Sequence, residues 1–501
     1  MICVSLGRTR HKMMIAEHQQ LAQKGAQLVE LRLDWLGNPP DLGRLLKDKP
    51  TPVVITCRRS QDKGLWKFGE DQRQTLLRSA IVAGVDYVDL EEDIAGTIRR
   101  YGSTKRIISY HNFDETPANL AEIHQRLASR DPDVVKLVTT AKVPEDNIRL
   151  LEVVKNAKVP TVGFCMGDLG VWSRILCRKY GAPFTYATFS AQRTMAPGQL
   201  TFEETRDVFH FDQINAETQV FGVVADPVAH SLSPLIHNAA FLAQGVNAVY
   251  LPFRIPRERF EHSLKALEAL DIRGYSVTLP HKVAALELAQ TKISPTAEIG
   301  ALNTLFRGAA GEWCGANTDC DAALASLRLS FDPGGDPLHP QTDPLNGKRV
   351  LILGAGGVSR AIATGLIRAG AAVTITNRTK SKAADLAQSL GCVLAGWENR
   401  GAVGTDILIN CTSVGMHPKV DETPFQQHWL DEAMTVFDTV YTPERTLLIA
   451  QARERGCKVV TGVDMFVRQA ARQYEYFTGR SAPIEVMRDT LKKAISVVKV
   501  T

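Results

Sequence analysis

The sequence has little that would place it among membrane or nucleic-acid-binding proteins. It contains no uninterrupted apolar stretch long enough to cross a bilayer and no run rich in lysine and arginine. Lys+Arg (59) and Asp+Glu (54) nearly balance. The amino terminus, MICVSLGRTRHKMM, becomes polar at once and lacks the apolar core of a signal peptide. We therefore expect no nucleic-acid partner and no membrane association. The slight excess of cationic residues is better explained by the binding of small anionic substrates.

Cysteines are also few, and they are scattered. The nine of them stretch from Cys3 to Cys457 without a C-x-x-C pair. An odd, unclustered set indicates reduced thiols, and neither a disulfide framework nor a zinc site. We expect a cytoplasmic protein without a bound metal. The oligomeric state stays open, and a homo-oligomer is compatible with the sequence.

Residues 1–212 contain short apolar, β-branched runs that alternate with segments of helical periodicity, such as 119–129 and 147–156. About eight strand–helix units in about 200 residues match a (β/α)₈ barrel, and a doubly wound open sheet is the alternative. The expected strands cover residues 2–6, 28–33, 52–57, 87–90, 106–110, 134–139, 161–165 and 184–189.

Polar residues at the ends of these runs favour the barrel, whose chemistry lies at the carboxyl ends of its strands. Each alone has an ordinary explanation, such as a solvated lysine, a core histidine or a surface ion pair. Their convergence at one end of a barrel instead favours a site for an anion. The residues are Glu30, Arg32, Arg58, His111, Arg174 and Gln199.

Lys136 lies inside the sixth run and is the candidate nucleophile. A lysine surrounded by cations loses its proton more readily, which makes the neutral amine available. Such an amine forms a Schiff base with a ketone. The iminium acidifies the adjacent carbon, from which His111 can take the proton.

The first half resembles type I 3-dehydroquinate dehydratase over essentially its whole length, through residues 4–6, 30–34, 57–58, 109–113, 135–137, 170–174 and 196–199. The resemblance implies that Lys136 is the Schiff-base lysine and His111 the general acid/base. It also implies that the carboxylate and hydroxyls of dehydroquinate are held by Ser5, Glu30, Arg32, Arg58, Arg174 and Gln199. The chain departs from the family at Met195, where a serine is frequent. It departs again at Asp62-Lys63-Gly64, where a glutamate usually precedes paired glycines, and we interpret Asp62 as a shorter substitute that orients His111.

The second half begins with a strand at residue 220, after a polar segment at 212–219. Ser231 and Ser233 stand at the start of a helix that Pro234 opens, where helix capping is the ordinary explanation and a carboxylate site the functional one. Further β-like runs end at residues that can meet at one sheet edge: Thr278, Lys282, Asn303 and Asp319. Lys282 and Asp319 form either a surface ion pair or a pair that handles the proton accompanying hydride transfer.

A glycine-rich turn is the strongest local signal in the chain. Residues 354–357 separate a strand at 349–353 from a helix at 359–369 and a second strand at 372–376. This context favours a dinucleotide pyrophosphate on the helix amino terminus, despite Ser359 in place of the last glycine. The second strand ends in Asn377-Arg378-Thr379-Lys380, without the acidic residue of NAD sites. A guanidinium and a hydroxyl suit a 2′-phosphate, so NADP(H) is the expected cofactor.

The second half resembles shikimate dehydrogenase over nearly all of its length, through residues 231–234, 277–282, 302–304, 317–319, 354–360, 377–379, 410–413 and 469–471. The resemblance implies that Lys282 and Asp319 form the catalytic pair. It implies shikimate contacts at Ser231, Ser233, Thr278, Asn303, Tyr441 and Gln469. It implies a cofactor site made of Gly354, Ala355, Gly356, Gly357, Val358, Asn377, Arg378, Thr379, Lys380, Ser381, Lys382, Thr439 and Gly462.

Together the resemblances imply three domains. These are the barrel over 1–212, a substrate-binding domain over 219–331 plus 467–501, and a Rossmann-type NADP-binding domain over 345–466, which follows a proline-rich loop at 332–344. The implied function is dehydration of 3-dehydroquinate to 3-dehydroshikimate, followed by NADPH-dependent reduction to shikimate.

Three rival functions remain at this point. In the first alternative the second half acts on quinate, but the hydroxyls of Ser231 and Thr278 favour shikimate. In the second alternative the chain is a regulatory protein that keeps both enzyme folds. Such a protein should have lost at least one of the four catalytic candidates, and all four are present. In the third alternative the barrel serves only as an assembly platform, and separate assays of the two activities would reveal this.

Overall fold

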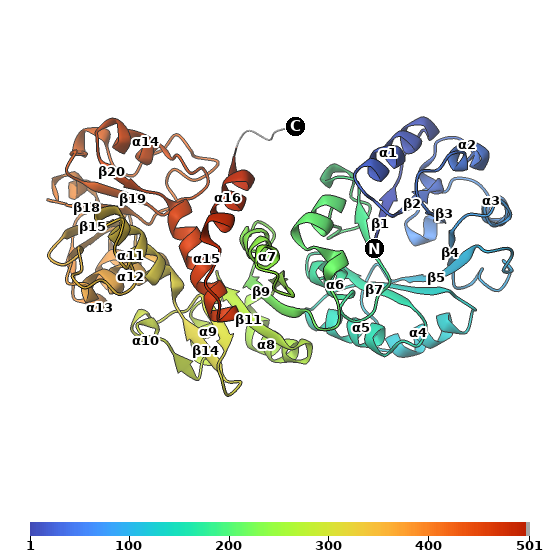
Figure 1. The fold of residues 1–501 in the computed structure, drawn as a ribbon, viewed down its shortest axis with the longest axis horizontal. Helices are drawn as coiled ribbons and strands as arrows, with labels where there is room; N and C mark the ends of the chain where they lie inside the picture. The colour runs from blue at the N-terminus through green and yellow to red at the C-terminus, as the bar shows by residue number, and fades with distance from the viewer. Residues whose placement is uncertain (497–501) are drawn as a thin grey trace. The chain divides into compact units, whose positions relative to one another are not determined.

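The computed structural model describes residues 1–496 (Figure 1). Contacts divide the chain into two compact units, of which the first holds residues 1–220, 226–230 and 247–272 and the second holds the remainder. The three-domain division stays a prediction, and its residues 497–501 lie outside the described part. Within residues 1–496, no helix combines the length and the apolar character that a membrane span requires.

The first unit contains a sheet of eight parallel strands in the order β7-β6-β5-β4-β3-β2-β1-β8. Because β1 pairs with both β2 and β8, the sheet curves into a nearly closed barrel. The predicted (β/α)₈ barrel is confirmed, and each expected run contains a strand. The strands are β1 (Ile2–Leu6), β2 (Leu28–Arg32), β3 (Val53–Thr56), β4 (Tyr87–Glu91), β5 (Lys105–His111), β6 (Val134–Thr140), β7 (Thr161–Met166) and β8 (Thr185–Thr188).

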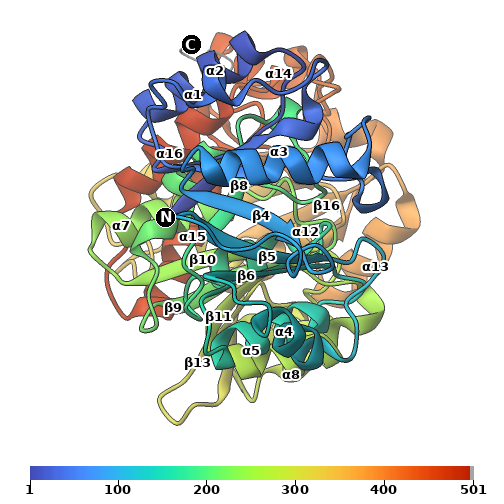
Figure 2. The ribbon, with the colours of Figure 1, turned by 90° about the vertical axis from the view of Figure 1, so that its right-hand side faces the viewer.

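Helices ring these strands, and Figure 2 shows α3 lying along β4 and α4 beside β5 and β6. Helix α5 packs against β7. In α4 the buried residues Leu120, Ile123 and Leu127 recur at helical spacing, which explains why this segment folds as a helix against the sheet. The helices are α1 (His11–Gln23), α2 (Leu42–Leu46), α3 (Glu70–Val82), α4 (Leu120–Ala128), α5 (Glu145–Asn156) and α6 (Val171–Leu176). The strand β10 (Ala248–Arg254) and helix α8 (Phe260–Leu267) also belong to this unit.

The second unit contains two sheets. In the first, neighbouring strands follow the order β9 (Gln219–Ala225), β11 (Ile272–Val277), β13 (Thr304–Arg307), β14 (Trp313–Ala316) and β12 (Thr291–Lys292). Its helices are α7 (Ser233–Ala243), α9 (Ala284–Leu288), α10 (Thr296–Ile299) and α11 (Thr318–Phe331). The carboxyl-terminal helices α15 (Gly462–Thr478) and α16 (Ile484–Ile495) pack against α11 and α7.

The other sheet of this unit is fully parallel, in the order β17-β16-β15-β18-β19-β20. Numbered along the chain, this is the 3-2-1-4-5-6 order of dinucleotide-binding folds, so the predicted Rossmann-type domain is confirmed. The strands are β15 (Arg349–Leu353), β16 (Ala372–Thr376), β17 (Val393–Leu394), β18 (Ile407–Asn410), β19 (Thr435–Asp438) and β20 (Lys458–Val460). The helices are α12 (Gly357–Arg368), α13 (Lys380–Leu390) and α14 (Leu447–Glu454).

Candidate active sites

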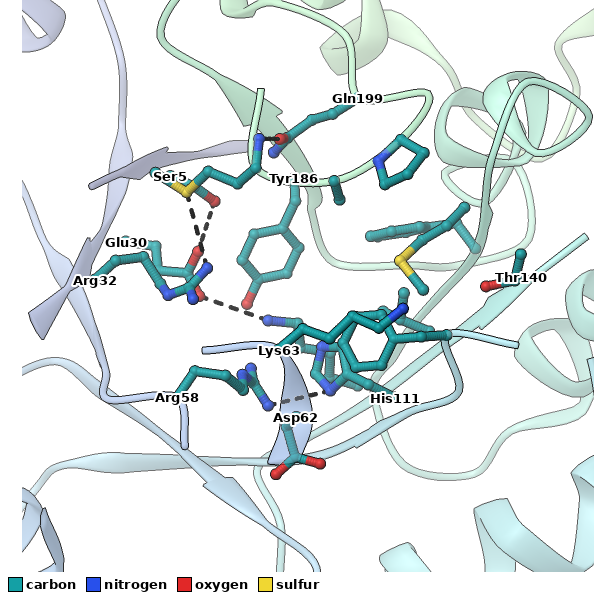
Figure 3. Close-up of a pocket in the computed structure, with 18 of the residues that line it drawn as sticks. Ser5, Glu30, Arg32, Arg58, Asp62, Lys63, His111, Thr140, Tyr186 and Gln199 are labelled. Carbon is teal, nitrogen blue, oxygen red and sulfur yellow. Dashed lines mark hydrogen bonds and ion pairs between the residues drawn. The ribbon is translucent and has the colours of Figure 1, made fainter. Parts of the chain in front are cut away.

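A cavity of about 300 Å³ opens at the carboxyl ends of the barrel strands (Figure 3). The structure brings together at this cavity every residue that the sequence predicted for the first half. These residues are Ser5, Glu30, Arg32, Arg58, His111, Lys136, Arg174 and Gln199. The cavity is lined in addition by aromatic and apolar side chains, among them Phe113, Phe164 and Tyr186.

Lys136, on β6, is only 4% exposed. Its Nζ donates to Asp89 Oδ2 at 2.9 Å and lies 3.5 Å from Glu30 Oε1, above the ring of Tyr186 at 3.9 Å from its centre. The direct charged partners of this lysine are therefore two carboxylates, and not the cations that the sequence analysis expected next to it. The reason is that strands β2 and β4 direct the carboxylates of Glu30 and Asp89 into the barrel interior, where they contact the Lys136 amine.

Asp89 is a site residue that the sequence analysis missed. It is buried on β4, accepts from Ser109 Oγ at 2.6 Å and lies 3.3 Å from Arg58 Nη2. Burial alone would raise its pKa, but the charges of Lys136 and Arg58 hold the pKa of Asp89 well below its ordinary value. The available signal was the strand alternation in residues 87–91, which puts Asp89 and Glu91 on one face.

His111 ends β5 and is oriented by Arg58, whose Nη1 lies 3.1 Å from His111 Nδ1. Burial, reinforced by the charge of Arg58, lowers the pKa of His111 well below its ordinary value. The imidazole is therefore neutral near pH 7 and able to accept a proton. The interpretation of Asp62 as the group that orients His111 is wrong, because the Asp62 carboxylate instead forms an ion pair with Arg59.

Two of the predicted binding residues are held by neighbours before any ligand arrives. Glu30 accepts from Ser5 Oγ at 2.5 Å and from Thr56 Oγ1 at 2.8 Å. Arg32 donates through Nε and Nη2 to the two oxygens of Asp34, at 2.9 and 2.8 Å. Burial opposes the charge on Glu30, yet Lys136 and Arg32 keep the pKa of this carboxyl below its ordinary value.

Arg174, on α6, is 2% exposed and stacks on Phe164, with Cζ 4.4 Å from the ring centre. Its Nη2 donates to the carbonyl of Pro197 at 3.2 Å. Within residues 1–496, no carboxylate lies within 4.0 Å of its nitrogens, and burial lowers the pKa of Arg174 to about 10. This buried positive charge needs an anion to compensate it. Gln199 lies near it in the cavity wall, where its Oε1 accepts from the amide of Met195 at 2.9 Å.

In the second unit, Lys282 Nζ lies 2.5 Å from Asp319 Oδ2, in the first turn of α11. Asn303 fixes the start of that helix, because its Oδ1 accepts from Thr318 N at 2.8 Å and its Nδ2 donates to Thr318 Oγ1 at 3.0 Å. The amide of Leu302 donates to the carbonyl of Lys282 at 2.9 Å. The structure thus brings Lys282, Asn303 and Asp319 together.

The contacts of the other predicted substrate residues are more local. Thr278 follows β11, and its amide donates to the carbonyl of Val224 at 3.1 Å. Ser231 Oγ accepts from the amide of Ser233 at 3.3 Å, so this hydroxyl helps to begin α7, as helix capping would.

Tyr441 and Gln469 meet at Phe466. The ring of Tyr441 lies 4.6 Å from the Phe466 ring, and Gln469 Nε2 donates to the Phe466 carbonyl at 3.1 Å. One turn further along α15, Gln473 Nε2 donates to the carbonyl of Asn303 at 3.1 Å. The helix that carries Gln469 is therefore hydrogen-bonded to the loop that carries Asn303.

The glycine-rich turn has the local geometry that a pyrophosphate requires. Gly354 has φ +113°, and a Cβ there would lie 2.9 Å from the carbonyl of Cys411. A Cβ on Gly356 or Gly357 would meet nothing within 4 Å, so the space above the amino end of α12 is open. Ser359, fully buried, accepts from the amide of Gly356 at 3.3 Å and so stabilises the turn that a third glycine would occupy.

The loop after β16 presents cations at the amino end of α13. Asn377 Nδ2 donates to the carbonyl of Thr379, the N-cap residue, at 2.9 Å. Arg378, Lys380 and Lys382 are exposed around this helix end. A helix amino terminus with several cations and no acidic residue fits a 2′-phosphate. The residues present therefore fit NADP(H).

Two further predicted cofactor residues have structural roles of their own. Thr439 Oγ1 donates to the carbonyl of Asn410 at 2.8 Å. Gly462 begins α15, and a Cβ there would lie 2.3 Å from the carbonyl of Val440, so close packing requires glycine. In residues 1–496, no group of three or more His, Cys, Asp or Glu side chains has an arrangement that could hold a metal ion.

A barrel with a buried strand lysine, joined to a dinucleotide-binding fold with a partly buried Lys–Asp pair, defines an enzyme with two sites of different chemistry. The comparisons with known proteins divide in the same way. The model of type I 3-dehydroquinase matches residues 2–216. Models of the shikimate dehydrogenase substrate-binding domain, of shikimate/quinate 5-dehydrogenase and of the shikimate 5′-dehydrogenase C-terminal domain match residues 223–305, 338–422 and 462–492.

One relative matches nearly the whole chain. The chloroplastic bifunctional 3-dehydroquinate dehydratase/shikimate dehydrogenase of Arabidopsis thaliana is 37% identical, over 98% of this chain and 84% of that protein. The shikimate dehydrogenase (NADP(+)) of Methanosarcina barkeri is 39% identical over 56% of this chain and 99% of its own. A crystal structure of a shikimate dehydrogenase in complex with NADP+ aligns with TM-score 0.51 and 32% identity, over 56% of this chain and 98% of that one. The chain belongs to the family of bifunctional 3-dehydroquinate dehydratase/shikimate dehydrogenases.

Proposed function

We propose that this chain catalyses two consecutive reactions, the Schiff-base dehydration of 3-dehydroquinate to 3-dehydroshikimate and the NADPH-dependent reduction of 3-dehydroshikimate to shikimate. The observation that carries the proposal is the buried amine of Lys136, held by Asp89 and next to a neutral histidine in a cavity with an uncompensated arginine. The relatives from Arabidopsis thaliana and Methanosarcina barkeri are both named as shikimate dehydrogenases, so activity on quinate and a purely regulatory role are not favoured.

In the dehydration, the Lys136 amine adds to the substrate ketone, and water leaves to form the iminium. His111 takes a proton from the adjacent carbon, the hydroxyl β to the iminium leaves as water, and hydrolysis of the iminium regenerates the amine. The carboxylate of the substrate compensates the charge of Arg174. The remaining carboxylate and hydroxyl contacts come from Ser5, Glu30, Arg32, Arg58 and Gln199.

In the reduction, Lys282 and Asp319 hold the reacting oxygen and transfer the proton that it gains. NADPH, when bound, supplies the hydride. The turn at 354–358 and the loop at 377–382, with Thr439 and Gly462, hold the cofactor. Ser231, Ser233, Thr278, Asn303, Tyr441 and Gln469 hold the substrate, whose hydroxyls and carboxylate match this set of hydroxyl, amide and phenol groups.

We also propose the three-domain division at 1–212, 219–331 plus 467–501, and 345–466, which the polar segment 212–219 and the proline-rich loop 332–344 support. A cytoplasmic location is proposed from the scattered free cysteines, with small-molecule substrates as the partners and no nucleic acid or membrane among them. A homo-oligomer is compatible with this account. Fluorescence imaging of a tagged full chain tests the location, and light scattering tests the oligomeric state.

The amine chemistry is tested by borohydride reduction in the presence of dehydroquinate. We expect the mass of the reduced ligand on the peptide that contains Lys136, and no adduct on the Lys136→Ala chain, which keeps its reductase activity. A peptide map with no adduct at Lys136 of the native chain would contradict the mechanism.

A further inference from the structure

Two of the cations that line the barrel cavity have no carboxylate partner among the described residues. Five cations line it, namely Arg32, Arg58, Lys63, Lys136 and Arg174. Arg32 pairs with Asp34. Arg58 pairs with Asp89 and Glu91, and Lys136 pairs with Asp89 and Glu30. Within residues 1–496, no carboxylate lies within 4.0 Å of the nitrogens of Arg174 or of Lys63. The charge available to an anionic ligand therefore comes from Arg174 and from Lys63, which the sequence analysis did not assign to the site.

The backbone at Lys63 is held in place on both sides. Lys63 follows the short helical turn Ser60–Asp62 and has φ +55°, a conformation that few residues other than glycine adopt. The next residue, Gly64, lies so close to Arg58 that an added Cβ would be 2.0 Å from the Arg58 carbonyl oxygen. The amide of Leu65 then donates to Asp34 Oδ2 at 3.1 Å. This loop is therefore packed against Arg58 and hydrogen-bonded to Asp34, and Lys63 lines the cavity.

The Lys63 side chain lies across the cavity beside the catalytic histidine (Figure 3). Its Nζ is 4.6 Å from the centre of the Phe113 ring, and that ring stacks on His111 with centroids 5.9 Å apart at 16°. A ring face attracts an ammonium but does not neutralise it, and an exposed lysine stem moves freely. The ammonium can therefore exchange the ring for an anion at small cost.

We propose that Lys63 is a substrate-binding residue of the barrel site, which leaves the face of Phe113 to bind the carboxylate that Arg174 also binds. This inference rests on the proposed dehydratase function for the identity of the substrate. Arg174 is buried and rigidly stacked, so it orients the carboxylate. Lys63 is exposed and reaches the cavity from a loop, so it attracts the anion and covers the site once the anion is bound. It touches no reacting atom, and its contribution should appear in binding.

The kinetic test compares Lys63→Gln with Lys67→Gln in the full chain. Lys67 is an exposed lysine of the same loop that does not line the cavity, so it is a matched control for charge. We expect Lys63→Gln to raise the KM for dehydroquinate about tenfold, with kcat within about twofold, as the loss of a charged hydrogen bond does. Lys63→Arg should restore most of the affinity, and Lys67→Gln should change neither constant. An unchanged KM in Lys63→Gln, or a loss confined to kcat, would overturn the proposal.

A binding measurement separates this inference from the proposed function. Calorimetric titration with quinate, a saturated ring carboxylate, reports anion binding without turnover, and reductase activity reports that each variant is folded. A Kd for quinate about tenfold weaker in Lys63→Gln than in Lys67→Gln supports the anion-binding role of Lys63. Failure of the native chain to dehydrate dehydroquinate would contradict the proposed function and would leave that role standing. Equal quinate affinity in the two variants would overturn the role of Lys63 while leaving the proposed function intact.

Discussion

Removal of the charge on Asp89 should destabilise the barrel far more than removal of a surface charge. Asp89 is 2% exposed and is the acceptor shared by Lys136, at 2.9 Å, and Arg58, at 3.3 Å. In Asp89→Asn the amide oxygen still accepts a hydrogen bond, but two buried cations lose their common counter-charge. Breaking a buried ion pair from one side costs about 3–5 kcal/mol, and the retained acceptor favours the lower figure, about 3 kcal/mol.

The assay is urea inactivation of the full chain, with dehydration reporting on the barrel and reduction reporting on the second half. With a slope of about 3 kcal/mol per molar urea, a loss of about 3 kcal/mol moves the midpoint of dehydratase inactivation down by about 1 M. Asp93→Asn is the control, because Asp93 pairs with Arg59 at the surface and is 58% exposed. Its loss should cost less than about 1 kcal/mol. Equal midpoints for the two variants would refute the assignment of Asp89 as the central counter-charge.

Three further predictions concern single side chains. Arg58→Gln should move the acid limb of the dehydratase pH–kcat/KM profile toward higher pH, because the guanidinium charge helps to hold the pKa of His111 low; an unmoved limb contradicts this. Arg378→Ala should reduce kcat/KM with NADPH about 10- to 100-fold and leave NADH nearly unchanged, as expected for a lost phosphate contact; equal losses with both cofactors would exclude it. Burial raises the pKa of Asp438 to about 6, so the folded state favours the protonated carboxyl. The protonated form therefore contributes to the free energy of unfolding below about pH 4, and this contribution is lost as the pH rises through about 6. Asp438→Asn should therefore unfold at a higher temperature than the native chain at pH 8, and the gain should vanish near pH 4; scanning calorimetry at both pH values decides.

Strand positions could be predicted from the sequence because each barrel strand is a short apolar run with its own turn signals. The expected run 134–139, for example, became β6 (Val134–Thr140). Four of the five cations that line the cavity could also be predicted, because charges at the ends of several such runs converge at one end of a barrel. The partners of those cations could not. The contact of Lys136 with Asp89 joins β6 to β4, two strands away in the sheet, and periodicity orders residues only along one strand.

The same limit explains the errors at single residues. Asp62 could be placed near the site from its motif. Its ion pair with Arg59, in place of a contact with His111, depends on the conformation of the loop. Ser359 occupies a template glycine position, and only the structure shows its hydroxyl accepting from the Gly356 amide. Lys63 stands where the family has glycine, so the motif gave no reason to expect a side chain in the cavity.

We propose that two separate sites in one chain carry out successive reactions. The most direct test supplies dehydroquinate and NADPH to three full-length proteins, the native chain, Lys136→Ala and Lys282→Met, and follows dehydroshikimate and shikimate over time. We predict that the native chain makes shikimate, that Lys136→Ala makes neither product but still reduces added dehydroshikimate, and that Lys282→Met accumulates dehydroshikimate. Dehydroshikimate formed by Lys136→Ala at the native rate, or shikimate formed by Lys282→Met at the native rate, would contradict the account.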